Sequence, residues 1–288
     1  MITNIQESSP DQLLSPGVWR TQWYREPMLV AGACLLGMIA IVLFLAPLLT
    51  SYDPLKQDLN QILQPPGGHH ILGTDQLGRD VWARLLYAGR TDLQVGVIAL
   101  IAPFVLGTIL GCIAGYQGGW VDSVIMRLVD VVIAFPAYVL VIALVFVFGE
   151  GLKGIYIAIA LTAWVAYARI ARSGILVAKR QEYVLAARAG GLSAMRIVGR
   201  HILPNIISLA IVYAMVDIVA NILYVSTLSY LGLGVPPPTP EWGALIVDGQ
   251  QFITTHPLLT VAPGAAIVIS GLAFALIGDG VTRVLRPQ

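Results

Sequence analysis

Long apolar runs alternate with short polar segments along the 288 residues of this chain. A helix needs about 20 apolar residues to cross the hydrocarbon core of a bilayer. Six runs reach that length, so the pattern predicts an all-α, polytopic membrane protein with six transmembrane helices. These helices are expected at residues 28–50, 93–116, 123–148, 155–175, 206–231 and 258–285.

Two polar segments flank the first predicted span. Residues 1–27 are expected to form an N-terminal tail, in which Trp19 and Trp23 suit the headgroup level of a membrane. Residues 51–91 are expected to form an outer loop, and Thr74 or Asp75 can cap a helix there. We expect this helix to lie along the membrane surface on an apolar side formed by Leu77, Val81, Leu85 and Leu86.

The composition supports a membrane protein. The chain is 57% hydrophobic and 11% charged, whereas soluble domains carry about 25% charged residues. Seven of the 17 lysines and arginines lie between residues 169 and 205. With both termini in the cytoplasm, the inner segments hold 12 of these basic residues and the outer segments hold five. The positive-inside rule therefore favours that orientation.

The basic segment has the pattern of two short helices joined by an elbow. Good helix formers occupy residues 182–189, Gly190 and Gly191 break the helix, and Ser193 can cap a second helix that ends near Pro204. The plainer alternative is a basic loop that only fixes topology. Apolar residues recur at roughly helical spacing, so each helix has a face to pack: Val184, Ala187, Met195, Val198 and Ile202.

This segment resembles the cytoplasmic EAA loop of permease subunits in ABC importers, in particular their peptide and nickel branch. Ala186 and Ala187 match the two alanines of the pattern, and Gly191 matches its glycine. Leu185 replaces the glutamate, and Ile202 lies one place late in the closing motif. The resemblance implies that residues 176–205 form a coupling loop that docks on an ATPase. The residues it assigns to this coupling are Tyr183, Ala186, Ala187, Arg188, Gly191, Ser193, Arg196 and Pro204.

Further phrases extend the resemblance over about residues 72–287, namely LGTDQLGRDVWARLLYAGRTDL, MRLVDVVIAFP, GVPPPTPEWG and IGDGVTRVL. They imply the type I ABC importer permease fold, with a core permease domain at residues 92–288. The implied partners are a second homologous permease in a heterodimer, two cytoplasmic ATPase subunits or domains, and a periplasmic or lipid-anchored binding protein. The implied location is the bacterial inner membrane, in contact with its lipids and with both termini cytoplasmic.

Motifs for catalysis and metal binding are missing from the sequence. There is no GxxxxGK[ST] phosphate loop, so ATP and Mg²⁺ are expected on partner subunits and no cofactor on this chain. Without HExxH, GxSxG or CxxC we expect neither an enzyme nor a metal site. Cys34 and Cys112 are expected to be small core residues, and His69 and His70 solvated loop residues. Nucleic acid is not an expected ligand.

Ionisable residues at membrane depth are candidates for a translocation path. Asp130 is one candidate, although a salt bridge with Arg127, or a contact of this pair with the coupling region, would explain it structurally. Asp217 and Asn221, one helical turn apart, either line the path or form hydrogen bonds between helices. Pro136 should kink the third span.

Two more local features have alternative interpretations. Asp279 and Arg283 are expected to form a local ion pair near the end of the sixth span. The resemblance places Glu241 and Trp242, in the proline-rich loop before that span, at the outer mouth, where they either contact the binding protein, gate the exit from it or form a structural plug.

The cargo is expected to be a dipeptide or oligopeptide, with glutathione and nickel or metallophore complexes as alternatives within the same branch. An ion-coupled secondary transporter is the alternative from a different class. In that case Asp130, Asp217 and Asp279 would bind protons or cations.

Overall fold

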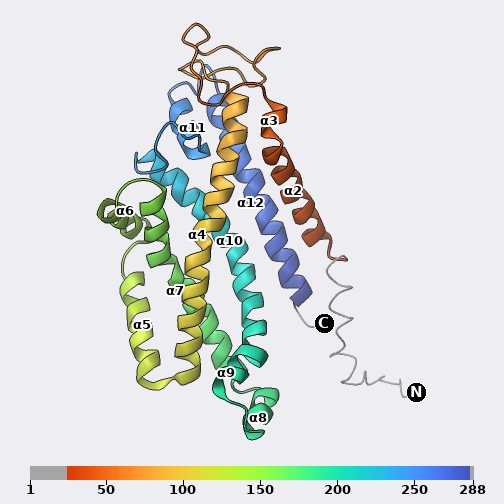
Figure 1. Ribbon diagram of the computed structural model, residues 1–288, viewed down its shortest axis with the longest axis vertical. Coiled ribbons are helices and arrows are strands. Elements are labelled where there is room, and N and C mark those ends of the chain that lie inside the picture. Colours follow the sequence, from red (N-terminus) through yellow and green to blue (C-terminus); the bar gives the residue numbers. More distant parts are fainter. Residues whose placement is uncertain (1–24, 286–288) are drawn as a thin grey trace, which may run out of the picture.

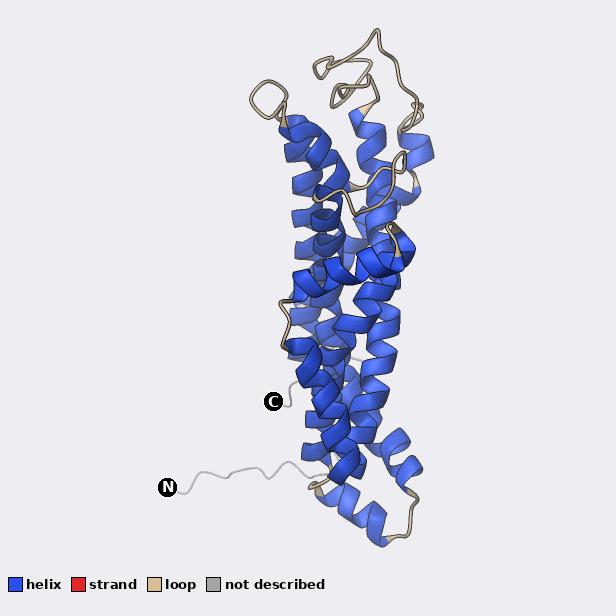
Figure 2. Ribbon diagram, turned by 90° about the vertical axis from the view of Figure 1, so that its left-hand side faces the viewer, coloured by secondary structure: helices blue, strands red, loops and turns tan. Residues whose placement is uncertain are grey.

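The computed structural model describes residues 25–285, and every regular element in this part of the chain is a helix. Long helices run side by side along one axis (Figures 1 and 2). The loop between α3 and α4 lies at one end of this axis, here called the loop end, and α8 and α9 lie at the other (Figure 1).

Five described helices are long and apolar enough to cross a membrane, and a bent pair completes the six that the sequence predicts. The long helices are α2 (Pro27–Phe44), α4 (Val81–Gln117), α7 (Leu152–Ala178), α10 (Leu203–Tyr230) and α12 (Leu258–Leu285). The bent pair is α5 (Gly119–Ile133) and α6 (Ala137–Phe148). The short helices are α3 (Ala46–Leu49), α8 (Glu182–Ala189), α9 (Ala194–Ile197) and α11 (Trp242–Gln250).

The expectation of a separate surface helix before the second span is wrong, because α4 runs without a break from Val81 to Gln117. Its N-cap is Asp80, whose carboxylate accepts a hydrogen bond from the Ala83 amide at 2.6 Å. The polar residues in its first half have partners on other elements. Arg90 donates to the Leu43 carbonyl at 2.6 Å, and Asp92 accepts from the Trp242 amide at 2.9 Å. These contacts let the helix continue through a polar stretch.

Close packing joins α4 to α7, as the glycine series of α4 indicates. A Cβ atom on Gly107 would lie 2.2 Å from the Trp164 carbonyl oxygen, and one on Gly111 would lie 2.2 Å from the Ala168 carbonyl oxygen. Gly115 continues this face against Ile175. Small residues at this spacing let two backbones approach within van der Waals distance.

The third predicted span is broken rather than kinked. The axes of α5 and α6 differ by 92° across a short break that ends at Pro136. Proline has no amide hydrogen and cannot continue the ladder of α5. Val129 anchors α5 on α7, where it packs against Val165 and Ala168.

Candidate functional site

The elbow predicted at Gly190 and Gly191 is present in the structure. Gly191 has φ +77°. Its amide donates to the Arg188 carbonyl at 3.0 Å, and the Leu192 amide donates to the Ala187 carbonyl at 3.2 Å. This pair of bonds is a Schellman motif, which ends a helix on a glycine in the left-handed conformation. The chain therefore turns sharply between α8 and α9.

The second short helix does not end near Pro204. Ser193 occupies the N-cap of α9 without a side-chain hydrogen bond. The chain then passes through a π-helical turn, Val198–Ile202, directly into α10. The wider turn lies where the Pro204 ring would meet the carbonyl four residues earlier, so the helix can pass a proline without stopping.

A buried face holds the tip, residues 176–205, on the bundle. Val184, Ile197 and Ile202 are buried against a cluster that includes Ile175 of α7 and Cys112 of α4. Lys179 adds hydrogen bonds from its ammonium group to the Tyr116 carbonyl at 2.8 Å and the Gly115 carbonyl at 3.3 Å. Because α4 and α7 both contribute to these contacts, we expect a displacement of the tip to move the ends of these two helices as well.

The opposite face of the tip combines apolar and basic side chains at the surface. Met195 is 86% exposed, which contradicts the expectation that it packs inward. Tyr183 and Leu185 are also exposed. An exposed apolar patch with a polar rim is typical of a protein-binding surface. The exposed basic residues around it are Arg180, Arg188, Arg196 and Arg200.

The remaining residues assigned to this surface by resemblance also lie at the tip. Ala186, Ser193 and Pro204 are exposed, and Ala187 is half-buried against the cluster beneath. These residues belong to α8, to α9 and its N-cap, and to the start of α10, and α8 and α9 lie at one end of the molecule (Figure 1).

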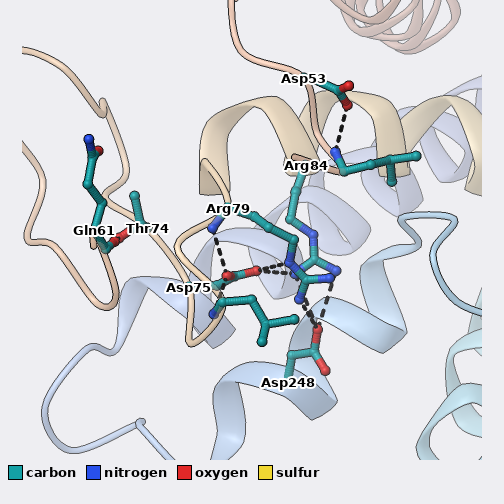
Figure 3. A network of polar contacts seen from close by, with 9 residues as sticks. Asp53, Gln61, Thr74, Asp75, Arg79, Arg84 and Asp248 are labelled. Carbon is teal, nitrogen blue, oxygen red and sulfur yellow. Dashed lines mark hydrogen bonds and ion pairs between the residues drawn. The ribbon is translucent and has the colours of Figure 1, made fainter. Parts of the chain in front are cut away.

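At the loop end, ionic contacts join the segment before α4 and the first turn of α4 to α11 (Figure 3). The Asp75 carboxylate accepts hydrogen bonds from Arg79 Nε at 2.7 Å and Arg84 Nη1 at 2.5 Å. Asp248 of α11 accepts from the same two guanidinium groups at 3.1 and 3.2 Å. We call these four residues the outer latch.

His70 is buried, which corrects the expectation of a solvated residue. One ring nitrogen lies 2.8 Å from the Asp80 carboxylate and the other lies 2.7 Å from the Gln61 side-chain oxygen. His69 is exposed, as expected. Among the described residues no group of three metal-binding side chains is present.

Glu241 and Trp242 are both buried, so the structure places them inside the bundle and not on its surface. The Glu241 carboxylate caps α11 by accepting from the Gly243 and Ala244 amides at 2.7 and 2.8 Å. The Trp242 ring nitrogen donates to the Leu85 carbonyl at 3.0 Å. This geometry matches the structural plug and leaves neither side chain open to a partner in this conformation.

Asp217 and Asn221 are buried as well. The Tyr167 hydroxyl donates to Asp217 at 2.9 Å, and the Asn221 amide group donates to the Gly96 carbonyl at 3.4 Å. These are hydrogen bonds between helices, the second of the two interpretations. Sequence reasoning gave no role to Asp92 or Asp248, whose partners lie more than 140 residues away along the chain.

The two local ion pairs considered from the sequence, Arg127–Asp130 and Asp279–Arg283, are not formed within residues 25–285. Arg127 and Asp130 are exposed on α5, Asp279 and Arg283 are exposed on α12, and none of the four takes part in a salt bridge. The ion pair on α5 instead joins Asp122 to Arg172 of α7. Its two hydrogen bonds measure 2.5 and 2.6 Å.

A bundle with five helices that are long and apolar enough to cross a membrane, a bent pair that can form a sixth span, and an elbow with apolar and basic side chains at one end has the architecture of a transporter subunit. Residues 107–288 match the family described as the binding-protein-dependent transport system inner membrane component. Residues 17–66 match the N-terminal transmembrane domain of oligopeptide transport permease C. The chain belongs to this family and is an ABC importer permease of the dipeptide and oligopeptide type. This membership decides against an ion-coupled secondary transporter.

Relatives match almost the full length of the chain. It is 37% identical to the dipeptide transport system permease protein DppC of Alkalihalophilus pseudofirmus, over 96% of this chain and 92% of DppC. It is 36% identical to the glutathione transport system permease protein GsiD of Pectobacterium atrosepticum, over 94% and 91%. The probable D,D-dipeptide transport system permease protein DdpC of Escherichia coli is 34% identical, over 91% and 88%.

The fold is also found in a solved structure. A chain of the inward-facing MetNI methionine ABC transporter superposes with a TM-score of 0.59 and 17% identity, over 70% of this chain and 96% of that chain. This likeness concerns the fold alone, and it agrees with the type I importer permease fold expected from the sequence.

Proposed function

We propose that this chain is one of two homologous permease subunits that enclose the path of a peptide importer. A binding protein delivers dipeptides or short oligopeptides at the loop end, and ATPase subunits that bind ATP and Mg²⁺ dock at the tip. Peptides are favoured as cargo because the chain resembles DppC and DdpC over nearly its whole length. Glutathione, the cargo named for GsiD, is itself a peptide.

One observation carries the proposal, namely the two-sided construction of the tip. Its inner face packs against α4 and α7, and its outer face exposes Tyr183, Leu185 and Met195. A helix with one packed face and one exposed apolar face suits a groove on another protein. A push by an ATPase on this surface would therefore reach the spanning helices directly.

The charge distribution supports an orientation with the tip and both termini in the cytoplasm of a bacterial cell. Four exposed arginines surround the elbow, whereas at the loop end the loop between α3 and α4 contains two basic residues, Lys56 and Arg79, and the proline-rich residues 232–240 contain none. Basic residues are retained on the cytoplasmic side of inner membranes. The polar tail expected at residues 1–27 falls almost entirely outside the described residues.

The test uses the complete importer, purified through this chain and reconstituted in proteoliposomes. The variant Leu185→Asp with Met195→Asp places two carboxylates on the exposed face and leaves the buried face intact. We expect the ATPase subunits to dissociate or lose their stimulation by the binding protein, and uptake of a labelled dipeptide to fall at least roughly tenfold, because desolvating two carboxylates opposes docking.

The matched control is Arg283→Asp, which adds an exposed acid on α12 outside the tip and should leave uptake unchanged. Undiminished stimulation and uptake in the double variant would contradict the proposed docking surface. Competition between labelled dialanine, glutathione and a nickel chelate in the native complex identifies the cargo class.

A further inference from the structure

One side of α5 carries polar residues although the helix belongs to a spanning segment. Ser123, Arg127 and Asp130 are all exposed, and their spacing of four and three residues aligns them in one strip along the helix. Val129 is buried on another side, against α7. The strip therefore points away from the bundle of this chain.

With Trp120 at the headgroup level, the length of α5 places Asp130 at membrane depth. Near the start of α5, Trp120 is 77% exposed, which suits the headgroup level. Asp130 lies ten residues further along, or about 15 Å at 1.5 Å per residue, which is about half of a 30 Å hydrocarbon core. Arg127 has a side chain long enough to reach the interface, but Asp130 does not. Contact with lipid at this depth would be costly for a carboxylate.

The bundle offers these charges no partner. Within residues 25–285 neither Arg127 nor Asp130 forms an ion pair. By contrast, Asp122 of the same helix faces α7 and binds Arg172 through two hydrogen bonds. The carboxylate that faces the bundle is thus neutralised, and the one that faces outward is not. Within the described part of this chain, no basic group is paired with Asp130, which leaves its carboxylate to water or to a charged ligand.

The exposed side of α5 has an apolar strip beside the polar strip. Leu128 and Val124 are also exposed, and at 100° per residue they lie about 160° and 120° around the helix from Asp130. This apolar strip can face lipid while the polar strip faces a different environment. Such a division is typical of a helix at the wall of an aqueous cavity.

We propose that Ser123, Arg127 and Asp130 line the aqueous route between this chain and the second permease, and that Arg127 and Asp130 bind the carboxylate and the ammonium group of a passing peptide. Their charges are opposite, one helical turn apart and free of each other, which matches the two ends of a zwitterionic dipeptide. The peptide-binding role rests on the proposed function, whereas the position at the wall of the route does not.

Accessibility tests the position without reference to cargo. Asp130→Cys and Leu128→Cys are each made in a chain carrying Cys34→Ala and Cys112→Ala, and the reconstituted complex is treated with a cationic, membrane-impermeant thiol reagent. We expect labelling of Asp130→Cys and little labelling of Leu128→Cys. Equal absence of labelling at both positions would show that lipid or protein covers the strip, and would overturn the proposal.

Uptake tests the binding role. In Asp130→Asn and Arg127→Gln we expect uptake of labelled dialanine to fall roughly tenfold or more through loss of a charge-assisted hydrogen bond, with stimulation of ATP hydrolysis by the binding protein unchanged. The matched controls, Asp279→Asn and Arg283→Gln, alter exposed charges on α12 that also lack an ion pair, and should transport normally. Normal uptake in Asp130→Asn would overturn the binding role.

Failure of the two proposals can be told apart. A native complex that takes up no peptide while Asp130→Cys is labelled would refute the peptide cargo and support the strip as part of the wall. A native complex that takes up peptide while Asp130→Cys stays unlabelled would support the proposed function and refute the strip.

Discussion

Asp75 and Asp248 bind the same two arginines in the outer latch but differ in their exposure to solvent. The Asp75 side chain is 4% exposed and the Asp248 side chain is 35% exposed. Removing one charge from a buried pair leaves its partner without compensation, whereas an exposed pair is screened by water.

We therefore expect Asp75→Asn to destabilise the chain by about 3 to 5 kcal/mol and Asp248→Asn by about 1 kcal/mol or less. Thermal unfolding of the purified complex in detergent measures this difference as a larger fall in Tm for Asp75→Asn. Equal falls in Tm would mean that the latch is solvated to the same degree at both carboxylates.

The burial of single polar side chains could not be predicted from the sequence. The expected outer-mouth residue Glu241 is buried, and its carboxylate accepts hydrogen bonds from Ser226 and from amides of α11. His70 is buried for a similar reason, since Asp80 and Gln61 bind both of its ring nitrogens. In contrast, Gly191 was predictable, because the left-handed turn it makes is set by its immediate neighbours.

At the scale of elements, the contact between α4 and α7 depends on three glycines of α4 with no room for a side chain, namely Gly107, Gly111 and Gly115. Gly111→Ala would place a methyl group 2.2 Å from the Ala168 carbonyl oxygen, whereas nothing lies within 4 Å of a Cβ on Gly264 of α12. Overpacking of this kind costs about 1 to 3 kcal/mol, while alanine in place of glycine in an open helix contributes up to about 1 kcal/mol.

We expect Gly111→Ala to lower the Tm and the yield of the complex, and Gly264→Ala to leave both unchanged or slightly higher. Both are measured on complexes purified in the same detergent. If the two variants behave alike, the backbones of α4 and α7 are further apart in the assembled transporter.

The existence of the spanning helices followed from sequence, but their continuity did not. Long apolar runs predict membrane helices because few other structures satisfy the backbone in lipid. The polar stretch around Arg90 and Asp92 indicated an end to a helix, yet it lies inside α4. Arg90 and Asp92 bind groups of α2 and α11, so no local sequence pattern predicts these contacts.

At the scale of the whole molecule, α10 joins the two ends. It continues from the π-helical turn Val198–Ile202 at the tip to Ser226, whose hydroxyl donates to Glu241 at the start of α11 at 3.1 Å. One continuous helix thus links the tip to the loop end.

Deleting Gly199 from the π-helical turn should rotate the tip by about 100° relative to α10. We expect the deletion to abolish uptake of dipeptide driven by ATP, while the spanning part of α10 is unchanged in sequence. The control Gly199→Ala keeps the length of the turn and meets no atom within 4 Å, so uptake should persist. Uptake in the deletion variant equal to that of the control would contradict a rigid linkage.

The length of the unbroken helix α4 bears on where the proposed delivery takes place. Its 37 residues measure about 56 Å at 1.5 Å per residue, and a hydrocarbon core takes up about 30 Å. With the loop end outside, much of the excess stands above the bilayer as a raised rim that supports the outer latch. In this orientation the binding protein would deliver its substrate in the aqueous phase, beyond the headgroups. A soluble binding protein and a lipid-anchored one could then dock on the same surface.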